Sequence, residues 1–195
     1  MARVKIEGAG RFSCHYPKLA VMVTSQAKGK ANAMAVAWHS SISSSPPLYG
    51  ISITARRLSY ELILDSGRFG INFIPFEKAD LVASVGGISG RQTDKFEQFG
   101  IAIDEATMAS VPVLRDAYAC YECKLVDHYA CGDHEWVVGE VLATHFLEEF
   151  FASDGELEIA KVNPTLYAGS ERYVTAQGKK AQHLDRHIYG KRQRS

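Results

Sequence analysis

The residues best suited to chemistry form a short polar cluster, Thr54, Arg56, Arg57 and Ser59, between a predicted strand and a predicted helix. Backbone N–H groups at the start of a helix, together with the guanidinium fork of an arginine, make a good binding site for an anion. Either arginine could bind it. The same residues also suit the capped, solvated start of an ordinary helix, so their types alone leave both interpretations open.

A histidine and several hydroxyl and amide side chains are further candidates. His134 closes a Gly-Asp-His triplet in a predicted turn, where an imidazole can donate hydrogen bonds to a pyrophosphate or a carboxamide. A histidine in a turn can instead be satisfied by the backbone. Ser41 and Ser43 could offer hydroxyl groups to the anion, and Asn72 follows Phe69 on a short predicted strand. All of these residues depend on a fold that brings them together.

The cysteines do not have the pattern of a metal or redox centre. Cys120 and Cys123 are spaced as C-x-x-C, but the chain has only four cysteines and no second pair at the spacing of a zinc site. Both lie inside a predicted strand, where residues i and i+3 point to opposite faces, and not at a helix start. We therefore expect free thiols and no metal.

Two other motif classes are excluded. The glycine-rich segment 86–90 is neither a dinucleotide-binding fingerprint nor a P-loop, because no G-K-[ST] follows it and a predicted helix, not a strand, precedes it. A fixed NAD(P)-binding domain is therefore not expected. The chain also has no G-x-S-x-G nucleophile elbow, which argues against a hydrolase.

The composition is that of one globular domain. Of the 195 residues 46% are hydrophobic, and the formal net charge is zero, so nothing directs the whole chain to nucleic acid or an acidic membrane. No apolar run of about 18 residues predicts a membrane span, and no signal peptide is recognised, so we expect a cytoplasmic protein. We expect one domain over 1–178 and a basic tail over 179–195, either a nucleic-acid arm or simply solvated.

The hydrophobic pattern predicts mostly strands. They are expected over 20–25, 32–38, 48–53, 69–74, 117–128 and 136–146, with short helices over 57–64, 77–85 and 95–99. A hairpin turn is expected over 26–30, no strand over the serine-rich 40–45, and a turn-like connection over 129–134. About six strands with few helices favour a β-barrel over a doubly wound sheet.

Several sequence blocks, taken in order, resemble one family. They are Asn32–Ser41, Ser45–Leu48, Arg56–Tyr60, Ser66–Phe73, Ser89-Gly90 with Asp94–Phe96, and Gly132–His134 with Gly139–Val141. Their order resembles the flavin reductase-like family, and its flavoredoxin branch in particular, over roughly residues 14–170. The resemblance implies a split β-barrel that binds flavin mononucleotide (FMN). It also implies a homodimer with one flavin per subunit near the dimer interface.

The resemblance also implies roles for the candidate residues. A strand of small residues would let the backbone approach the flavin ring, and Trp38 would form part of an apolar wall, although 33–38 also suits an ordinary core strand. The strand residues concerned are Asn32, Ala33, Met34 and Ala35. The cluster Thr54, Arg56, Arg57 and Ser59, with Ser41 and Ser43, becomes the phosphate site. Asn72 is expected at the ring edge, Ser89, Gly90 and Lys95 in a loop near the flavin, and His134 beside a nicotinamide.

The function implied is that of an NAD(P)H-dependent flavin reductase. NADH or NADPH, bound only transiently, would reduce FMN, which would then deliver electrons to free flavin, an iron complex or a protein. Two other classes stay open: an FMN electron carrier that does not use NAD(P)H, and a split-barrel protein that binds a different ligand. A pyridoxamine phosphate oxidase-like barrel is a further alternative, but its sequence blocks are not seen.

Overall fold

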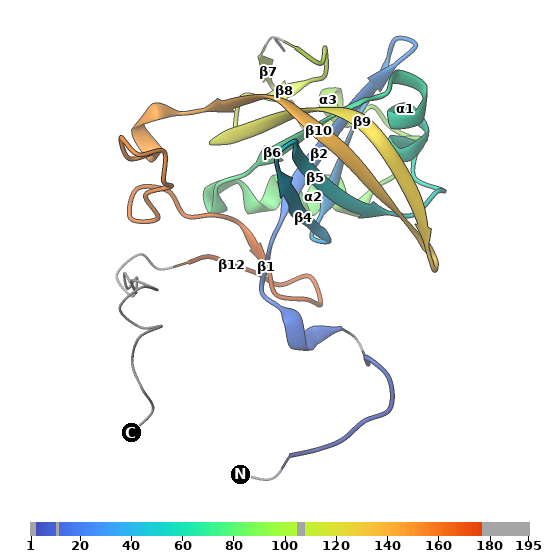
Figure 1. Ribbon diagram of the computed structural model, residues 1–195, viewed down its shortest axis with the longest axis vertical. Coiled ribbons are helices and arrows are strands. Elements are labelled where there is room, and N and C mark those ends of the chain that lie inside the picture. Colours follow the sequence, from blue (N-terminus) through green and yellow to red (C-terminus); the bar gives the residue numbers. More distant parts are fainter. Residues whose placement is uncertain (1–2, 11, 105–107, 177–195) are drawn as a thin grey trace.

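The computed structural model describes residues 3–10, 12–104 and 108–176. In this part of the chain seven strands form one antiparallel sheet, in the order β3-β2-β6-β9-β10-β5-β4 (Figure 1). Its strands are β2 (Val21–Ala27), β3 (Lys30–Val36), β4 (His39–Ser44), β5 (Pro47–Ile53), β6 (Arg68–Phe73), β9 (Ala119–Cys131) and β10 (His134–Phe146). The fold is mostly β with a few short helices, as predicted.

The sheet curls around a single core. Fully buried side chains from strands that are far apart in the sheet order, Val23 of β2, Ile51 of β5, Phe69 of β6 and Val137 of β10, meet in one hydrophobic cluster. Flat sheets cannot bring such strands together, so the sheet wraps around this cluster as a barrel does. Two register shifts between β9 and β10 bend the long hairpin that crosses the barrel in Figure 1.

Three α-helices occur in the described residues: α1 (Leu58–Ser66), α2 (Ala79–Gly87) and α3 (Lys95–Gln98). Helix α1 packs Leu58 and Leu62 against the barrel and ends at Gly67, whose φ of 67° is easily adopted without a side chain. Helix α2 buries Val82 and Val85 in a second hydrophobic cluster. Helix α1 packs beside β2 and β3, and helices α2 and α3 pack beside β3.

Shorter elements complete the described chain. Short strands β1 (Lys18–Leu19), β11 (Leu166–Tyr167) and β12 (Tyr173–Val174) form a small sheet that lies below the barrel in Figure 1. A two-stranded sheet is formed by β7 (Ile103–Asp104) and β8 (Val113–Leu114). The 3-10 helices are η1 (Ser13–His15), η2 (Phe76–Lys78) and η3 (Glu148–Phe150).

Two predicted connections are in fact strands. The serine-rich segment forms β4, an edge strand that pairs only with β5, and its exposed serines conceal the alternation that usually marks a strand. The connection expected over 129–134 is reduced to a tight turn, because β9 continues to Cys131 and β10 begins at His134. The remaining predicted helices and strands agree with the structure to within a few residues. The basic tail over 179–195 lies outside the described residues.

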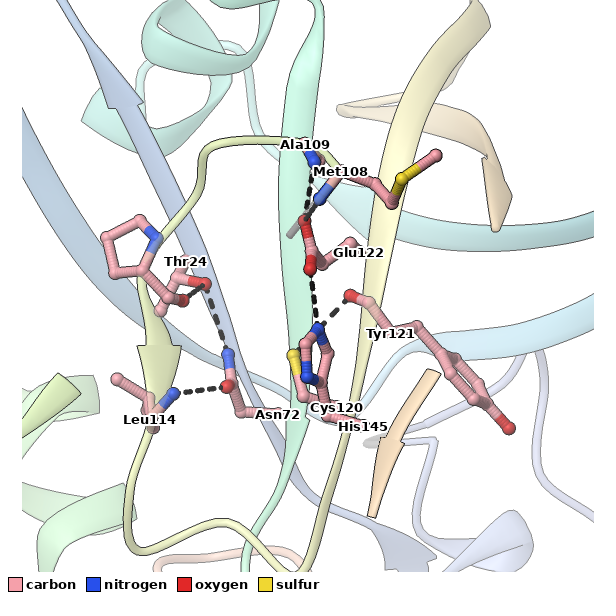
Figure 2. Close-up of polar contacts among 10 residues, drawn as sticks. Thr24, Asn72, Met108, Ala109, Leu114, Cys120, Tyr121, Glu122 and His145 are labelled. Carbon is pink, nitrogen blue, oxygen red and sulfur yellow. Dashed lines mark hydrogen bonds and ion pairs between the residues drawn. The ribbon is translucent and has the colours of Figure 1, made fainter. Parts of the chain in front are cut away.

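Asn72 is part of the structural core, and the structure does not place it at a binding site (Figure 2). Its Nδ2 donates to the Met22 carbonyl at 3.0 Å and to Thr24 Oγ1 at 3.1 Å, and its Oδ1 accepts from the Leu114 N–H at 2.8 Å. These bonds tie β6 to β2 and to β8. Because both ends of the amide are already hydrogen-bonded, Asn72 has a structural explanation that needs no ligand.

Figure 2 also shows a buried carboxylate on β9. Glu122 is fully buried and accepts hydrogen bonds from the N–H groups of Met108 and Ala109, while its other oxygen contacts His145 Nε2. A buried carboxylate needs such partners, because an unpaired charge in the core is costly. The contacts fasten the segment after residue 107 to the β9–β10 hairpin.

Candidate functional site

Two adjoining cavities lie between the start of α1, the end of α2 and strand β3. The larger has a volume of about 540 Å³ and the smaller about 230 Å³. Both are lined by Met34, Ala35, Arg57 and Gly86, so the two cavities lie next to each other. Ligand sites are typically about 300–1,000 Å³ and are placed where several elements meet, which is the situation here.

The smaller cavity is positively charged. It is lined by Arg56 and Arg57 at the start of α1 and by Lys95 of α3. Lys95 is only 4% exposed, and its Nζ donates to the carbonyls of Ala33 at 2.9 Å and Val85 at 2.8 Å. Burial, and then the nearby Arg57 guanidinium, lowers the pKa of Lys95 to about 8. An anion bound in this cavity would stabilise the charged form of Lys95 and offset its repulsion by the Arg57 guanidinium.

Asn32 lines the same cavity, and its amide is enclosed between Ser59 and Gly90. Its Nδ2 donates to Ser59 Oγ at 2.8 Å, whereas its buried Oδ1 has no hydrogen-bond partner among the described residues. Gly90 lies so close that a Cβ atom there would come within 2.1 Å of this oxygen. Gly90 therefore encloses this oxygen, and a residue with a side chain at position 90 would collide with Asn32.

The larger cavity has an aromatic end. Trp38 and His134 lie with ring centroids 5.1 Å apart, and Trp38 Nε1 donates to the Tyr16 hydroxyl at 3.3 Å. Tyr16 in turn packs edge-on against Tyr167 with a centroid separation of 5.3 Å. Such a wall is suited to a flat ligand, because aromatic rings favour stacked and edge-to-face contacts.

His134 is held by its chain neighbour. Its Nδ1 lies 2.7 Å from Asp133 Oδ1, and this hydrogen bond lowers the pKa of the Asp133 carboxyl. The contact favours the tautomer with the proton on Nδ1, which leaves Nε2 as an acceptor while the ring is neutral. His134 also lines the larger cavity, at the first residue of β10.

Most of the predicted site residues line the two cavities. Those lining the smaller one are Asn32, Arg56, Ser89, Gly90 and Lys95, those lining the larger one are Trp38, Thr54 and His134, and Met34, Ala35 and Arg57 line both. Ser59 lies behind Asn32, and Ala33 contributes its carbonyl to Lys95. Their roles toward a ligand stay predictions.

Five predicted residues line neither cavity, and two of them, Ala33 and Ser59, contact residues of the site as described above. Ser41 and Ser43 lie on the exposed edge strand β4, and Asn72 is enclosed in the core. Conversely, no sequence pattern singles out Tyr16, Tyr167 or Tyr173, which come together through the pairing of β1, β11 and β12. Gly86 and Gly87, in the glycine-rich segment 86–90, also line the larger cavity, where the end of α2 lies beside Ala35 of β3.

A comparison with known protein families identifies the family to which this chain belongs. The family model described as "Flavin reductase like domain" matches residues 12–176. The chain belongs to this family. The match includes every residue named above as lining the cavities, so the site of this flavin reductase-like chain lies within the family domain.

Individual relatives agree with this assignment. Structures of the FMN-binding protein from Thermus thermophilus, with bound 1-cyclohex-2-enone or p-hydroxybenzaldehyde, are 29% identical and cover 94% of this chain and 98% or 100% of theirs, with TM-scores of 0.81 and 0.83. Flavoredoxin from Methanosarcina acetivorans is 24% identical, with a TM-score of 0.84 over 95% of this chain and 97% of its own, and shows the same fold. The NADH-dependent flavin reductase StyB of Pseudomonas fluorescens is 29% identical over 64% of this chain and 69% of its own.

Other types of site have no support in the part of the chain that the structure describes. No group of three or more His, Cys, Asp or Glu side chains there could hold a metal ion. All four cysteines lie in this part and are free thiols. Burial raises the pKa of Cys120 to about 12 and that of Cys123 as well, which keeps both thiols protonated. Within the same residues, no helix is long and apolar enough to span a bilayer.

Proposed function

We propose that this flavin reductase-like chain is an NAD(P)H-dependent oxidoreductase that holds FMN across the two cavities. One observation carries the proposal: a cationic cavity with a buried lysine lies next to a larger cavity with an aromatic wall and shares four lining residues with it. FMN has the same division, with an anionic phosphate at one end and a flat ring at the other. The residues present therefore fit this cofactor.

The chain would bind the phosphate and the sugar alcohol in the smaller cavity. Arg57 and Lys95 would neutralise the phosphate, and Arg56 and Ser89 lie at the same cavity. The phosphate would thereby offset the positive charge that Arg57 and Lys95 bring together at this cavity.

The chain would hold the ring in the larger cavity. The small side chain of Ala35 lets β3 come close to a flat ligand, and Met34 and Trp38 supply apolar surface. His134 would lie on the side where the nicotinamide enters. When bound, the flavin would accept hydride from NADH or NADPH and deliver electrons to an acceptor. The protein would then have to stack and orient the nicotinamide and flavin rings. That role needs no acid–base pair with shifted pKa values.

The proposal also covers the electron acceptor, the oligomeric state and the cellular compartment. Free flavin, an iron complex and a redox protein are the acceptor classes considered, and the ligands bound to the Thermus protein add small conjugated carbonyl compounds. We propose a homodimer, which sedimentation velocity would test. The four unpaired cysteines support a reducing compartment, the cytoplasm.

An absorbance spectrum of the purified protein, before and after anaerobic addition of NADH or NADPH, tests the proposal. We expect the visible bands of oxidised flavin, and their bleaching by at least one of the two nucleotides. A yellow protein that neither nucleotide bleaches, but that dithionite does, is the outcome for an electron carrier without NAD(P)H activity. A colourless protein that takes up no added FMN would refute the cofactor and favour a barrel with another ligand.

A further inference from the structure

We infer that the Tyr16 hydroxyl is the hydrogen-bond donor that orients a planar carbonyl compound at the aromatic end of the larger cavity. The inference rests on the proposed function, in which the flavin ring occupies the part of this cavity that adjoins the phosphate site. It adds a specificity-determining residue to that function and assigns it a ligand class. The class is a conjugated carbonyl or carboxamide, which a nicotinamide and a small enone or aldehyde share.

The direction of the Tyr16 hydrogen bond follows from its partner. An indole N–H can only donate, so in the 3.3 Å contact with Trp38 Nε1 the Tyr16 oxygen must accept. The phenolic proton of Tyr16 is then left to donate elsewhere. No described residue accepts it, although the side chain lines the cavity. A donor fixed in place at a cavity wall is suited to an acceptor atom on a ligand.

Tyr16 is held from several sides, so its hydroxyl has a defined position. Its ring packs at 85° against Tyr167 and lies 4.5 Å from the ring of His15, centroid to centroid. Gly169, with a φ of 83°, faces the Tyr16 ring, and a Cβ atom there would come within 3.2 Å of it. A hydroxyl donor that is already held in place loses little conformational entropy when a ligand binds. It therefore favours ligands whose acceptor atom lies at the matching position.

The cavity has a place for such a ligand beside the flavin. The residues that join the two cavities, among them Arg57 and Gly86, mark the phosphate side, whereas Trp38, His134 and Tyr16 line the aromatic part of the larger cavity. A flat molecule placed there would stack against the Trp38 and His134 rings. Its carbonyl oxygen would accept from Tyr16, since Trp38 Nε1 is already occupied.

The test uses full-length protein loaded with FMN and the variant Tyr16→Phe, which removes only the hydroxyl. Dissociation constants are measured from the perturbation of the flavin spectrum by benzaldehyde, by toluene, and by the unreactive NADH analogue tetrahydro-NADH. Toluene has the shape of benzaldehyde without the carbonyl oxygen. Tyr129→Phe, an exposed tyrosine on the β9–β10 hairpin that lines neither cavity, is the matched control.

Loss of one neutral hydrogen bond corresponds to about a three- to tenfold increase in the dissociation constant. We expect this increase in Tyr16→Phe for benzaldehyde, for tetrahydro-NADH or for both, with no change for toluene and none in Tyr129→Phe. The affected compound identifies the source of the carbonyl: a small acceptor or the nicotinamide. Equal constants in Tyr16→Phe and the wild type for both carbonyl compounds would refute the inference while FMN stays bound. A wild-type protein that binds no FMN would refute the proposed function, and the inference with it.

Discussion

At the scale of single residues, the two adjacent arginines differ in their surroundings. Arg57 lines both cavities and is close enough to Lys95 to lower the pKa of that ammonium group. Arg56 lines only the smaller cavity, and its charge acts on Asp133 instead. The sequence could predict that an arginine of this pair binds phosphate but gave no basis for choosing between them. The structure favours Arg57.

This difference gives a prediction for a matched pair of variants. Arg57→Gln should weaken FMN binding by roughly 10- to 100-fold, because a hydrogen bond to a charged group contributes about 1.5–3 kcal/mol. Arg56→Gln should weaken it less than about threefold. Quenching of FMN fluorescence by the apoprotein measures both constants, and riboflavin, which lacks the phosphate, should respond to neither change. An equal loss in the two variants, or the reverse order, would contradict the assignment.

The buried lysine predicts how FMN binding depends on pH. The pKa of Lys95 is about 8, below the 10.5 of a free lysine, so between these values the unfolded chain binds more protons than the folded apoprotein. Burial of the charged amine thus costs stability below pH 8, and this cost falls as the pH rises. A bound phosphate favours the charged amine. FMN affinity should therefore be highest below pH 8 and decline above it.

The measurement is the FMN dissociation constant between pH 7 and about 9.5. Lys95→Met removes the titrating group and should lower the affinity at pH 7 and flatten its decline. Riboflavin binding, followed over the same range, separates ionisation of the ring from ionisation of the lysine. A decline of the same steepness in Lys95→Met would show that another group is responsible.

Residue types predicted the polar cavity much better than the aromatic one. The adjacent arginines Arg56 and Arg57, between a predicted strand and a predicted helix, suggest an anion site by their type and position. By contrast, nothing in the local sequence distinguishes Tyr16, Tyr167 and Tyr173 from other tyrosines. They form part of the site because their rings contact one another, Tyr16 with Tyr167 across a long separation in sequence and Tyr167 with Tyr173. Asn72 shows the opposite difficulty, because an amide on a strand looks the same in sequence whether it faces a ligand or, as here, three core partners.

At the scale of the elements, long apolar strands were predictable and polar edge strands were not. Strands β2, β5, β6, β9 and β10 bury most of one face, which leaves a visible hydrophobic pattern. Strand β4 lies at the sheet edge, with its serines largely exposed, and is held by backbone hydrogen bonds to β5. Such pairing depends on a neighbouring strand and leaves no mark in local composition.

Strand β10 has a glycine at a tightly packed position, Gly139, which gives a prediction at this scale. A Cβ atom at Gly139 would come within 2.4 Å of the Phe69 ring and 2.9 Å of the Cys123 Cβ. Both neighbours are fully buried, so they have little room to move. Gly139→Ala should lower the free energy of unfolding by about 1–3 kcal/mol, as overpacking of a core does. Urea denaturation measures this, with the exposed Thr144→Ala on the same strand as control, expected within about 0.5 kcal/mol of the wild type.

At the scale of the whole molecule, the site exists only because distant segments meet. Residues from β3, the β5–α1 connection, α2, the turn of β10 and the segment of β11 and β12 line one cavity. No local pattern specifies that arrangement, which is why a resemblance spread over most of the chain predicted it better than any single motif. The barrel supplies a rigid frame, and the ligand would be the element that connects the segments around it.

This view predicts a large stabilisation of the whole molecule by its cofactor. A ligand that binds only the folded chain, present at 100 times its dissociation constant, stabilises it by about 2.7 kcal/mol. For a chain of this length that corresponds to a rise in melting temperature of roughly 5–11 °C. Differential scanning fluorimetry, read from intrinsic tryptophan fluorescence, compares FMN with riboflavin at equal concentration, and riboflavin should produce the smaller rise. Because the phosphate contacts Arg57 in the proposed complex, Arg57→Gln should reduce the FMN effect at the same FMN concentration, and the Lys95 contact should keep it above that of riboflavin. An FMN effect that is undiminished in this variant would place the phosphate elsewhere.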